Sequence, residues 1–170
     1  MELFQQEKVG IAGGFCVEQK AEGHWEVNHP MHKDHVRGAF KAYHSDCFMA
    51  IGGLRPSMGW DTVDELLARF HGFSVRTLDH LEVKHLRPLG EGYSKSNASA
   101  QGKAFYQMRY GMVLSFLAAL KSALQKRSLT WLLALVWGTI TAAISQTEFM
   151  VSKEEGRFIR RHRWEQIRFQ

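Results

Sequence analysis

Three acidic side chains lie within one short segment of this 170-residue chain, Gly-Trp-Asp-Thr-Val-Asp-Glu at positions 59–65. Asp61 falls where a loop is expected to enter a helix, and a carboxylate there can act as general base toward a hydroxyl group when its neighbours tune its pKa. The same position suits an acid that only caps the helix or interacts favourably with its dipole. Asp64 and Glu65 are alternative bases, although acids in the first helical turn also stabilise the helix terminus.

Two further features could serve a ligand. His85 closes a predicted strand, where a neutral imidazole can bind a divalent cation, although a single histidine equally serves as a hydrogen-bonded structural residue. Gly38, which precedes Ala39 and Phe40, is a place where the backbone can approach a ligand closely. The four histidines between positions 24 and 35 match no zinc spacing, so this segment is expected to be a polar surface loop.

The composition is that of an ordinary globular protein. Hydrophobic residues make up 45% of the chain and charged residues 23%, which excludes a disordered or low-complexity protein. Lys and Arg total 22 against 17 Asp and Glu, for a net charge of +5, so an anionic partner is permitted but not identified. Cys16 and Cys47 form no metal-type pair and indicate a reducing compartment. The first residues lack the basic and apolar regions of a secretory signal.

Hydrophobic patterning predicts both strands and helices in the first half of the chain. Gly13 and Gly14 interrupt the first apolar run, so one strand is expected there, or two separated by a glycine turn. The second helix carries Thr62 and Glu65 at the spacing of a capping box, and Gly72 is its stop signal. The predicted elements are strands at 9–12 and 15–17, a loop at 18–35, helices at 45–51 and 61–70, and strands at 73–77 and 81–85.

The composition changes in the second half of the chain. A linker is expected over 93–103, apolar residues at helical spacing follow over 104–124, and 128–147 contains no charged residue. That last stretch just reaches the roughly 20 residues that cross a bilayer, so a membrane span, an interfacial or re-entrant helical hairpin, and ordinary core helices all stay open. Segment 156–170 interleaves five arginines with aromatic and aliphatic residues, which suits an amphipathic helix on an anionic membrane. No recognition-helix or aromatic-sheet motif accompanies it, so no nucleic-acid partner is expected.

Taken in order, several segments resemble the C-terminal half of the catalytic domain of glycosyltransferase family 2, of the GT-A type. The resemblance covers roughly residues 8–90 and rests on the order of the motifs more than on any one of them. It implies an α/β fold class: a partial GT-A fold, that of the nucleotide-diphospho-sugar transferases, over residues 1–92, and then C-terminal α-helices that form a membrane-associated region over 104–170. The matching segments are 9–14, 37–43, 48–54, 59–69 with 72–73, and 85–90.

The resemblance also implies roles for the candidate residues. The loop over 38–40 would lie beside the donor sugar, and Asp61 is the leading candidate for the acid that deprotonates the acceptor hydroxyl, with Asp64 second. His85 corresponds to a histidine that joins the metal shell in many GT-A enzymes, so a divalent cation, Mg²⁺ or Mn²⁺, is expected in the complete enzyme. The Tyr-His pair at 43–44 stands where these proteins often carry Tyr-Arg, which leaves a role toward the donor phosphate open.

The family pattern is incomplete at the front. Family members begin with a β-α-β nucleotide-binding half that ends in an Asp-x-Asp motif, which holds the metal and the donor diphosphate, and this sequence has no such motif. The chain is therefore expected to be the back part of a longer enzyme and inactive alone. Its expected completing partner is a separate N-terminal half or a second copy.

Two functions follow as alternatives. In the first, the chain is a fragment of an inverting sugar transferase, of the hexosyltransferase type, in polysaccharide, cell-envelope or glycolipid assembly. Its partners would be a nucleotide-sugar donor, a glycan or lipid-linked acceptor and a membrane surface, and it would lie on the cytoplasmic face of that membrane, peripherally or with a marginal inserted hairpin. In the second, residues 104–170 are the functional part of a non-catalytic membrane-surface module, and the degenerate transferase segment is scaffold.

Overall fold

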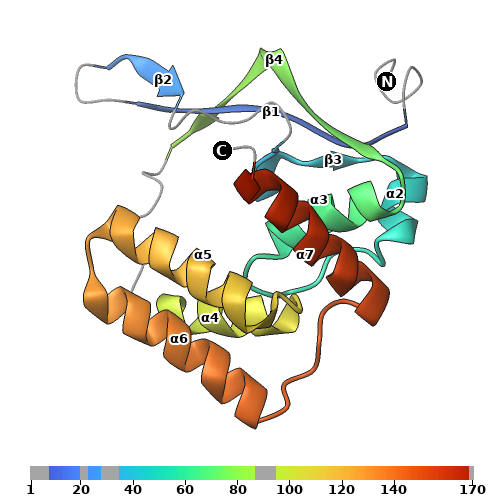
Figure 1. The fold of residues 1–170 in the computed structure, drawn as a ribbon. Coiled ribbons are helices and arrows are strands. Elements are labelled where there is room, and N and C mark those ends of the chain that lie inside the picture. The colour runs from blue at the N-terminus through green and yellow to red at the C-terminus, as the bar shows by residue number, and fades with distance from the viewer. Residues whose placement is uncertain (1–7, 20–22, 28–34, 87–94, 169–170) are drawn as a thin grey trace. The chain divides into compact units, whose positions relative to one another are not determined.

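The computed structural model shows two compact units (Figure 1). Unit 1 comprises Met1–Pro56 and Trp60–Glu91, and unit 2 comprises Ser57–Gly59 and Gly92–Gln170. The structure describes residues 8–19, 23–27, 35–86 and 95–168. Among these residues, unit 1 combines a mixed sheet with helices and unit 2 is helical, which confirms the α/β class at the coarse level.

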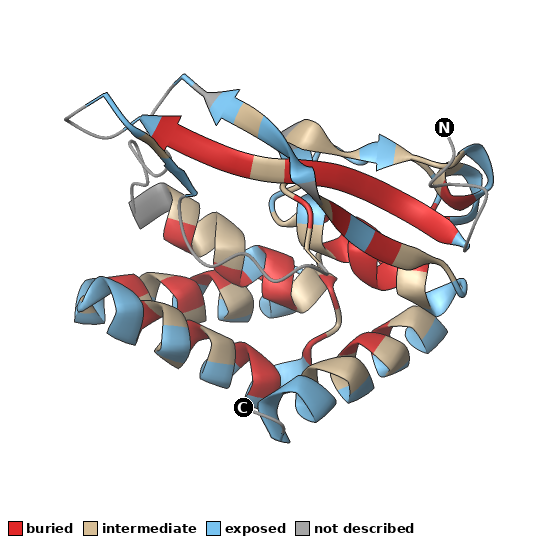
Figure 2. Ribbon diagram, turned by 90° about the horizontal axis from the view of Figure 1, so that it is seen from above, coloured by how far each residue is buried: buried red, intermediate tan, exposed pale blue. Residues whose placement is uncertain are grey.

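The sheet of unit 1 is organised around one long strand, β1 (Val9–Gln19). It pairs in parallel with β4 (Ser74–His85) along almost its whole length. On its other edge it pairs antiparallel with β3 (Ala42–Tyr43) near its start and with β2 (Trp25–Val27) near its end. Because both edges are paired and most side chains are covered, β1 is buried along nearly all its length (Figure 2). A continuous apolar run is the usual sequence of such a strand.

The two glycines inside β1 do not form the predicted turn. A Cβ atom at Gly13 would lie 2.2 Å from Cγ1 of Val36, and one at Gly14 would lie 2.3 Å from the main-chain oxygen of Leu81. Glycine is needed here because neighbouring segments approach the strand closely, which is its other common role in strands. Of the two alternatives, one strand or two separated by a glycine turn, the structure shows the single strand, over residues 9–19.

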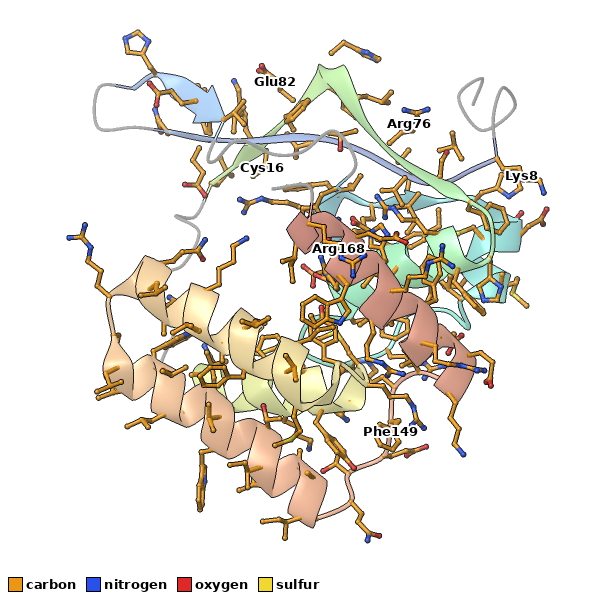
Figure 3. All side chains as sticks on the ribbon, in the orientation of Figure 1. Lys8, Cys16, Arg76, Glu82, Phe149 and Arg168 are labelled. Carbon is orange, nitrogen blue, oxygen red and sulfur yellow. The ribbon has the colours of Figure 1, made fainter. Side chains whose placement is uncertain are left out.

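Strand β4 also joins two predicted strands into one. Gly14 pairs with Leu78 and Phe15 pairs with Glu82, so residues 79–81 have no partner on β1 and form a bulge. The strand arches at its middle in Figure 1, and Figure 3 labels Arg76 and Glu82 on it, one on each side of the bulge. The predicted break was thus a local irregularity that bends a continuous strand. Strand β2 lies within the segment that was expected to be loop.

Helices α2 (Ser45–Ala50) and α3 (Trp60–Phe70) pack against the sheet in unit 1 (Figure 1). Both helices confirm the sequence prediction within one residue at each end, and Gly72, at φ +81°, follows the end of α3. The apolar stripe of α3 is fully buried, as expected for a helix with one core-facing side. Its buried hydrophobic residues are Trp60, Val63, Leu66, Leu67 and Ala68.

The described residues of unit 2 form four helices, and the first begins inside the predicted linker. They are α4 (Lys95–Gln107), α5 (Gly111–Lys126), α6 (Leu129–Ile144) and α7 (Lys153–Arg168). The helix predicted over 104–124 is interrupted at Arg109, whose φ of +55° is incompatible with a continuing helix. Among the described residues, no helix combines the length and the apolar character that a membrane crossing needs.

Two glycines allow α4 and α6 to cross at close range. A Cβ at Gly102 would lie 2.0 Å from the main-chain oxygen of Leu135, and one at Gly138 would lie 2.0 Å from that of Ser99. Thr139 Oγ1 donates a hydrogen bond to the main-chain oxygen of Gly102 at 2.9 Å. Backbones can approach this closely only where side chains are absent, so both glycines are packing requirements.

Helix α7 is attached to the turn between α4 and α5 by arginines. Arg109 Nε donates to the main-chain oxygen of Val151 at 2.9 Å, and its guanidinium carbon lies 3.5 Å from the ring centre of Phe149. Phe149 is labelled in Figure 3 on the connection between α6 and α7. From α7, Arg160 donates to the main-chain oxygen of Arg109 at 2.6 Å, and Arg163 donates to the hydroxyl of Tyr110 at 3.1 Å.

Replacing Gly138 by Ala should lower the free energy of unfolding of unit 2 by about 1–3 kcal/mol. Alanine favours an exposed helix over glycine by up to about 1 kcal/mol, but the added Cβ would meet backbone at 2.0 Å, so overpacking decides the sign. Urea unfolding followed by far-UV circular dichroism measures the change. The control is Lys103→Ala, an exposed site on α4, which should change stability by less than about 0.5 kcal/mol. A Gly138→Ala protein as stable as wild type would contradict the close crossing.

Candidate functional site

A lysine and two carboxylates form a buried cluster in unit 1. Nζ of Lys41 lies 2.8 Å from Oδ1 of Asp64 and 3.1 Å from Oε1 of Glu65. The three side chains are 1%, 1% and 7% exposed, respectively. Charges this deeply buried are tolerated only when they are paired and their hydrogen-bonding groups are satisfied. The cluster therefore forms only when the segment around Lys41 is seated on α3.

Further hydrogen bonds satisfy both carboxylates. The Tyr43 hydroxyl donates a hydrogen bond to Oδ2 of Asp64 at 2.5 Å. The main-chain N–H of Glu65 donates a hydrogen bond to Oδ1 of Asp64 at 2.6 Å. Oε1 of Glu65 accepts from the main-chain N–H of Val36 at 2.8 Å, and Oε2 lies 3.0 Å from Nδ1 of His35. All four carboxylate oxygens have partners, so residues 35–43 are held against the N-terminal turns of α3.

The surroundings of the cluster determine the protonation states of Glu65 and Tyr43 at neutral pH. Burial by itself would raise the pKa of Glu65, but the hydrogen bond from His35, the charge of Lys41 and a main-chain N–H together hold that pKa below its ordinary value of 4.5. Burial, with the hydrogen bond to Asp64, raises the pKa of the Tyr43 hydroxyl well above its ordinary value of 10. Glu65 is therefore an anion and Tyr43 is a hydrogen-bond donor at neutral pH.

Asp61 lies beside the short helix η1 (Gly38–Phe40). A Cβ atom at Gly38 would lie 2.9 Å from Cβ of Asp61 and 3.6 Å from its Oδ2, so this glycine lets the loop backbone lie against the aspartate. Nζ of Lys41 also donates to the main-chain oxygen of Asp61. Asp61 itself is exposed, at the first turn of α3. The loop and the exposed carboxylate are thus fixed relative to each other by the buried cluster.

The structure brings some of the predicted site residues together and separates others. Gly38 and Asp61, which are far apart in the sequence, adjoin. Asp64 lies about one turn further along α3, is buried, and uses both carboxylate oxygens inside the protein. Phe40 is half-buried at the end of η1. The side chains of Ala39 and His85 lie outside the described part of the chain.

The described residues do not form a complete divalent-cation site by themselves. Within residues 8–19, 23–27, 35–86 and 95–168, no group of three or more His, Cys, Asp or Glu side chains is placed to hold a metal ion. Cys16 and Cys47 are both buried, and burial raises the pKa of the Cys47 thiol to about 11, so neither is a ready thiolate ligand. Cys16 is labelled on β1 in Figure 3. We derive no reaction step through a metal.

Sequence reasoning missed Lys41 and His35, and it considered Glu65 only for other roles. Glu65 was assigned to a capping box with Thr62, but its carboxylate bonds to the segment around Val36. Lys41 and His35 had no assigned role. One signal could have found Lys41: in an extended segment, residues two apart share a face, so Lys41 and Tyr43 would point the same way. Both bond to Asp64.

Comparison of the chain with protein-family models, with curated proteins and with solved structures finds no match. The site's own geometry therefore carries the functional argument.

Replacing Glu65 by Gln should reduce the loss of stability in acid. Because the pKa of Glu65 is lower in the folded protein than its ordinary value of 4.5, the unfolded chain binds more protons, and the free energy of unfolding falls as the pH drops below about 4.5 through the folded pKa. Glu65→Gln removes this contribution, along with part of the stability at pH 7. Urea unfolding between pH 3 and pH 7 measures both. The exposed Glu82→Gln variant should keep the wild-type slope; an unchanged slope in Glu65→Gln would contradict the assignment.

Proposed function

We propose that unit 1 is the acceptor-side half of an inverting sugar transferase of the GT-A type, in which Asp61 removes the proton from the attacking hydroxyl group. The observation that carries this proposal is the close approach of the loop at Gly38 to Asp61. The two motifs that the resemblance assigns to the donor sugar and to the base adjoin in space. The nucleotide-binding half would supply the donor phosphate site.

The proposed reaction is a displacement at the anomeric carbon of a nucleotide sugar. The acceptor hydroxyl oxygen forms the new bond to that carbon, the bond to the diphosphate oxygen breaks, and the hydroxyl proton passes to the carboxylate of Asp61. A general base must be within hydrogen-bond reach of the proton that it removes. Asp61 is exposed and reachable, whereas Asp64 is buried and already bonded to Lys41 and Tyr43. This difference favours Asp61 as the base and gives Asp64 a structural role.

The remaining parts of the proposal concern the complete enzyme. A nucleotide-sugar donor and a glycan or lipid-linked acceptor are the proposed substrates, and a divalent cation would offset the charge of the leaving diphosphate. His85 remains the predicted metal ligand from this chain, and the other ligands would come from the nucleotide-binding half. The chain alone is proposed to be inactive.

A second candidate function is a peripheral membrane-surface module, formed by unit 2. Its support is the chemistry of α6, which has no charged residue in its 16 positions and carries several strongly exposed apolar side chains. Exposed apolar surface of this kind marks a binding face on a protein that is otherwise well packed. The two functions are compatible, because a transferase with a lipid-linked acceptor needs to work at a membrane surface, on its cytoplasmic face.

Replacing Asp61 by Asn should slow sugar transfer by roughly 10²- to 10⁴-fold in a preparation that combines this chain with a nucleotide-binding half. Donor affinity should be nearly unchanged, and stability should change by at most about 1 kcal/mol, because asparagine also caps helices. Single-turnover transfer and equilibrium donor binding separate the two effects. Asp46→Asn, at an exposed acid in the first turn of α2, is the matched control. A near-wild-type rate in Asp61→Asn would rule out this base.

The chain should sediment with lipid vesicles, and 1 M salt should release only part of it. Salt screens charge attraction over a Debye length of about 3 Å at that concentration, but it does not weaken burial of apolar side chains in the interface. Co-sedimentation at increasing lipid concentration gives the partition coefficient. Protein that stays in the supernatant at every lipid concentration would contradict the membrane proposal and would not bear on the transferase proposal.

A further inference from the structure

Helices α5 and α6 together present a row of large apolar side chains to solvent. We call this surface the hairpin face. Its members are between 39% and 78% exposed, far more than an apolar side chain in a packed core. They are Met112, Val113, Phe116 and Leu124 on α5, and Leu129, Leu133, Trp137, Ile140 and Ile144 on α6.

The spacing on α6 places its exposed residues along one stripe. Leu133, Trp137, Ile140 and Ile144 follow each other at intervals of four, three and four residues, which is the period of one helix face. The opposite side of the same helix carries Trp131, Leu135, Gly138 and Ala142, which are buried within unit 2. Helix α6 is therefore apolar on both sides, and packing within the described unit explains only one of them.

Helix α5 repeats this arrangement. Leu114, Ala119 and Ala123 are buried, while Val113, Phe116 and Leu124 are 63%, 52% and 68% exposed. The two helices join through a tight turn, in which Arg127 adopts the left-handed conformation at φ +48°. Trp131 Nε1 donates to Ser122 Oγ at 3.0 Å and links the two helices near that turn. The two exposed stripes thus belong to one helical hairpin.

The charges around the hairpin face have a single sign. The sequence contains no Asp or Glu between Glu91 and Glu148. On the hairpin, the charged residues are Lys121, Lys126 and Arg127, and all three are exposed. Nζ of Lys126 lies 4.3 Å from the ring centre of Trp131, in the first turn of α6. An exposed apolar surface whose own two helices carry only cationic charges is complementary to an anionic bilayer, in which apolar and negatively charged groups adjoin.

The length of the hairpin helices determines how they can meet a bilayer. Each has 16 residues, or about 24 Å at 1.5 Å per residue, which is shorter than the roughly 30 Å hydrocarbon core. A helix of this length with one exposed apolar stripe suits the interface plane, and lysines at its border can extend toward the headgroups.

We propose that the hairpin face lies flat in the headgroup and upper acyl region of an anionic bilayer, with Lys121, Lys126 and Arg127 against the lipid phosphates. This inference rests on the proposed membrane association of unit 2 and names the surface and the lipid class. The sequence-based expectation named both an interfacial hairpin over 128–147 and the arginine-rich tail, and this inference assigns the contact to the hairpin. In α7, Arg160 and Arg163 bond to the α4–α5 turn. Two other α7 arginines pair with glutamates: Arg157 with Glu154 and Arg161 with Glu165.

The test compares glutamate substitutions on and off the hairpin face. Phe116→Glu and Trp137→Glu should each lower partitioning of the full chain into phosphatidylcholine–phosphatidylglycerol vesicles by about tenfold or more, because burying one large apolar side chain contributes about 1.5–3 kcal/mol and tenfold is about 1.4 kcal/mol. Met49→Glu and Leu54→Glu are matched controls, since these apolar residues of unit 1 are 77% and 62% exposed. They should partition like wild type. Circular dichroism and gel filtration establish that each variant is folded.

Two further measurements make the test specific. Lys121→Gln combined with Lys126→Gln should remove most of the preference for phosphatidylglycerol over pure phosphatidylcholine. Brominated lipids should quench tryptophan fluorescence in the wild type and much less in Trp137→Phe, whereas Trp25→Phe, on strand β2, should keep the wild-type quenching.

The outcomes separate the two proposals. If wild type binds vesicles but Phe116→Glu and Trp137→Glu bind equally well, the membrane association stands and the hairpin face is the wrong surface. If wild type binds no vesicle, the association fails together with this inference. If wild type forms a dimer in lipid-free buffer that Trp137→Glu dissociates, the occupant of the hairpin face is a second copy, and the lipid assignment is overturned.

Discussion

The buried ion cluster of Lys41 with Asp64 and Glu65 is the interaction on which unit 1 depends. It joins the 35–43 segment to α3 at side chains that are almost fully buried. Desolvation of such ions opposes much of their attraction, so a cluster like this adds little net stability compared with apolar residues of the same size. Its effect is on specificity. Any arrangement in which Lys41 does not pack against α3 would leave two buried carboxylates without their cation. The buried cluster thereby fixes the position of the loop at Gly38 relative to the carboxylate of Asp61.

How much of the fold could be predicted depended on whether the signal was local. Helices α2 and α3 were predicted closely because the 3.6-residue period and a following glycine lie within the segment itself. The glycines of β1 left one strand or two open, because a turn glycine and a close-approach glycine look alike in sequence. What distinguishes them is Leu81 against Gly14, a contact between distant segments. Helix α4 was missed since its glycine and serines suggested a linker, whereas Gly102 serves the crossing with α6.

The candidate site shows the same division between local and distant information. Asp61 and Gly38 could each be selected from sequence as residues with chemical potential, and only the fold makes them neighbours. Asp64 was the second candidate after Asp61 in the sequence, and its burial distinguishes it from the exposed Asp61. Lys41 escaped notice because nothing near it in the chain explains a buried cation. Its partners lie 23 and 24 residues further on, as the positions of Asp64 and Glu65 show.

The two units differ in where their acidic side chains lie. In unit 1, Asp64 and Glu65 are paired with a lysine, and Asp61 is exposed in the first turn of a helix. Unit 2 has no acidic residue from Gly92 until Glu148, so nothing on the hairpin repels an anionic surface. Helix α6 illustrates why this matters: the same uncharged sequence supplies the buried crossing with α4 and the exposed stripe through Trp137. An ordinary core helix needs only the first of these faces. The second one is costly in water, and the proposed contact with a bilayer would cover it.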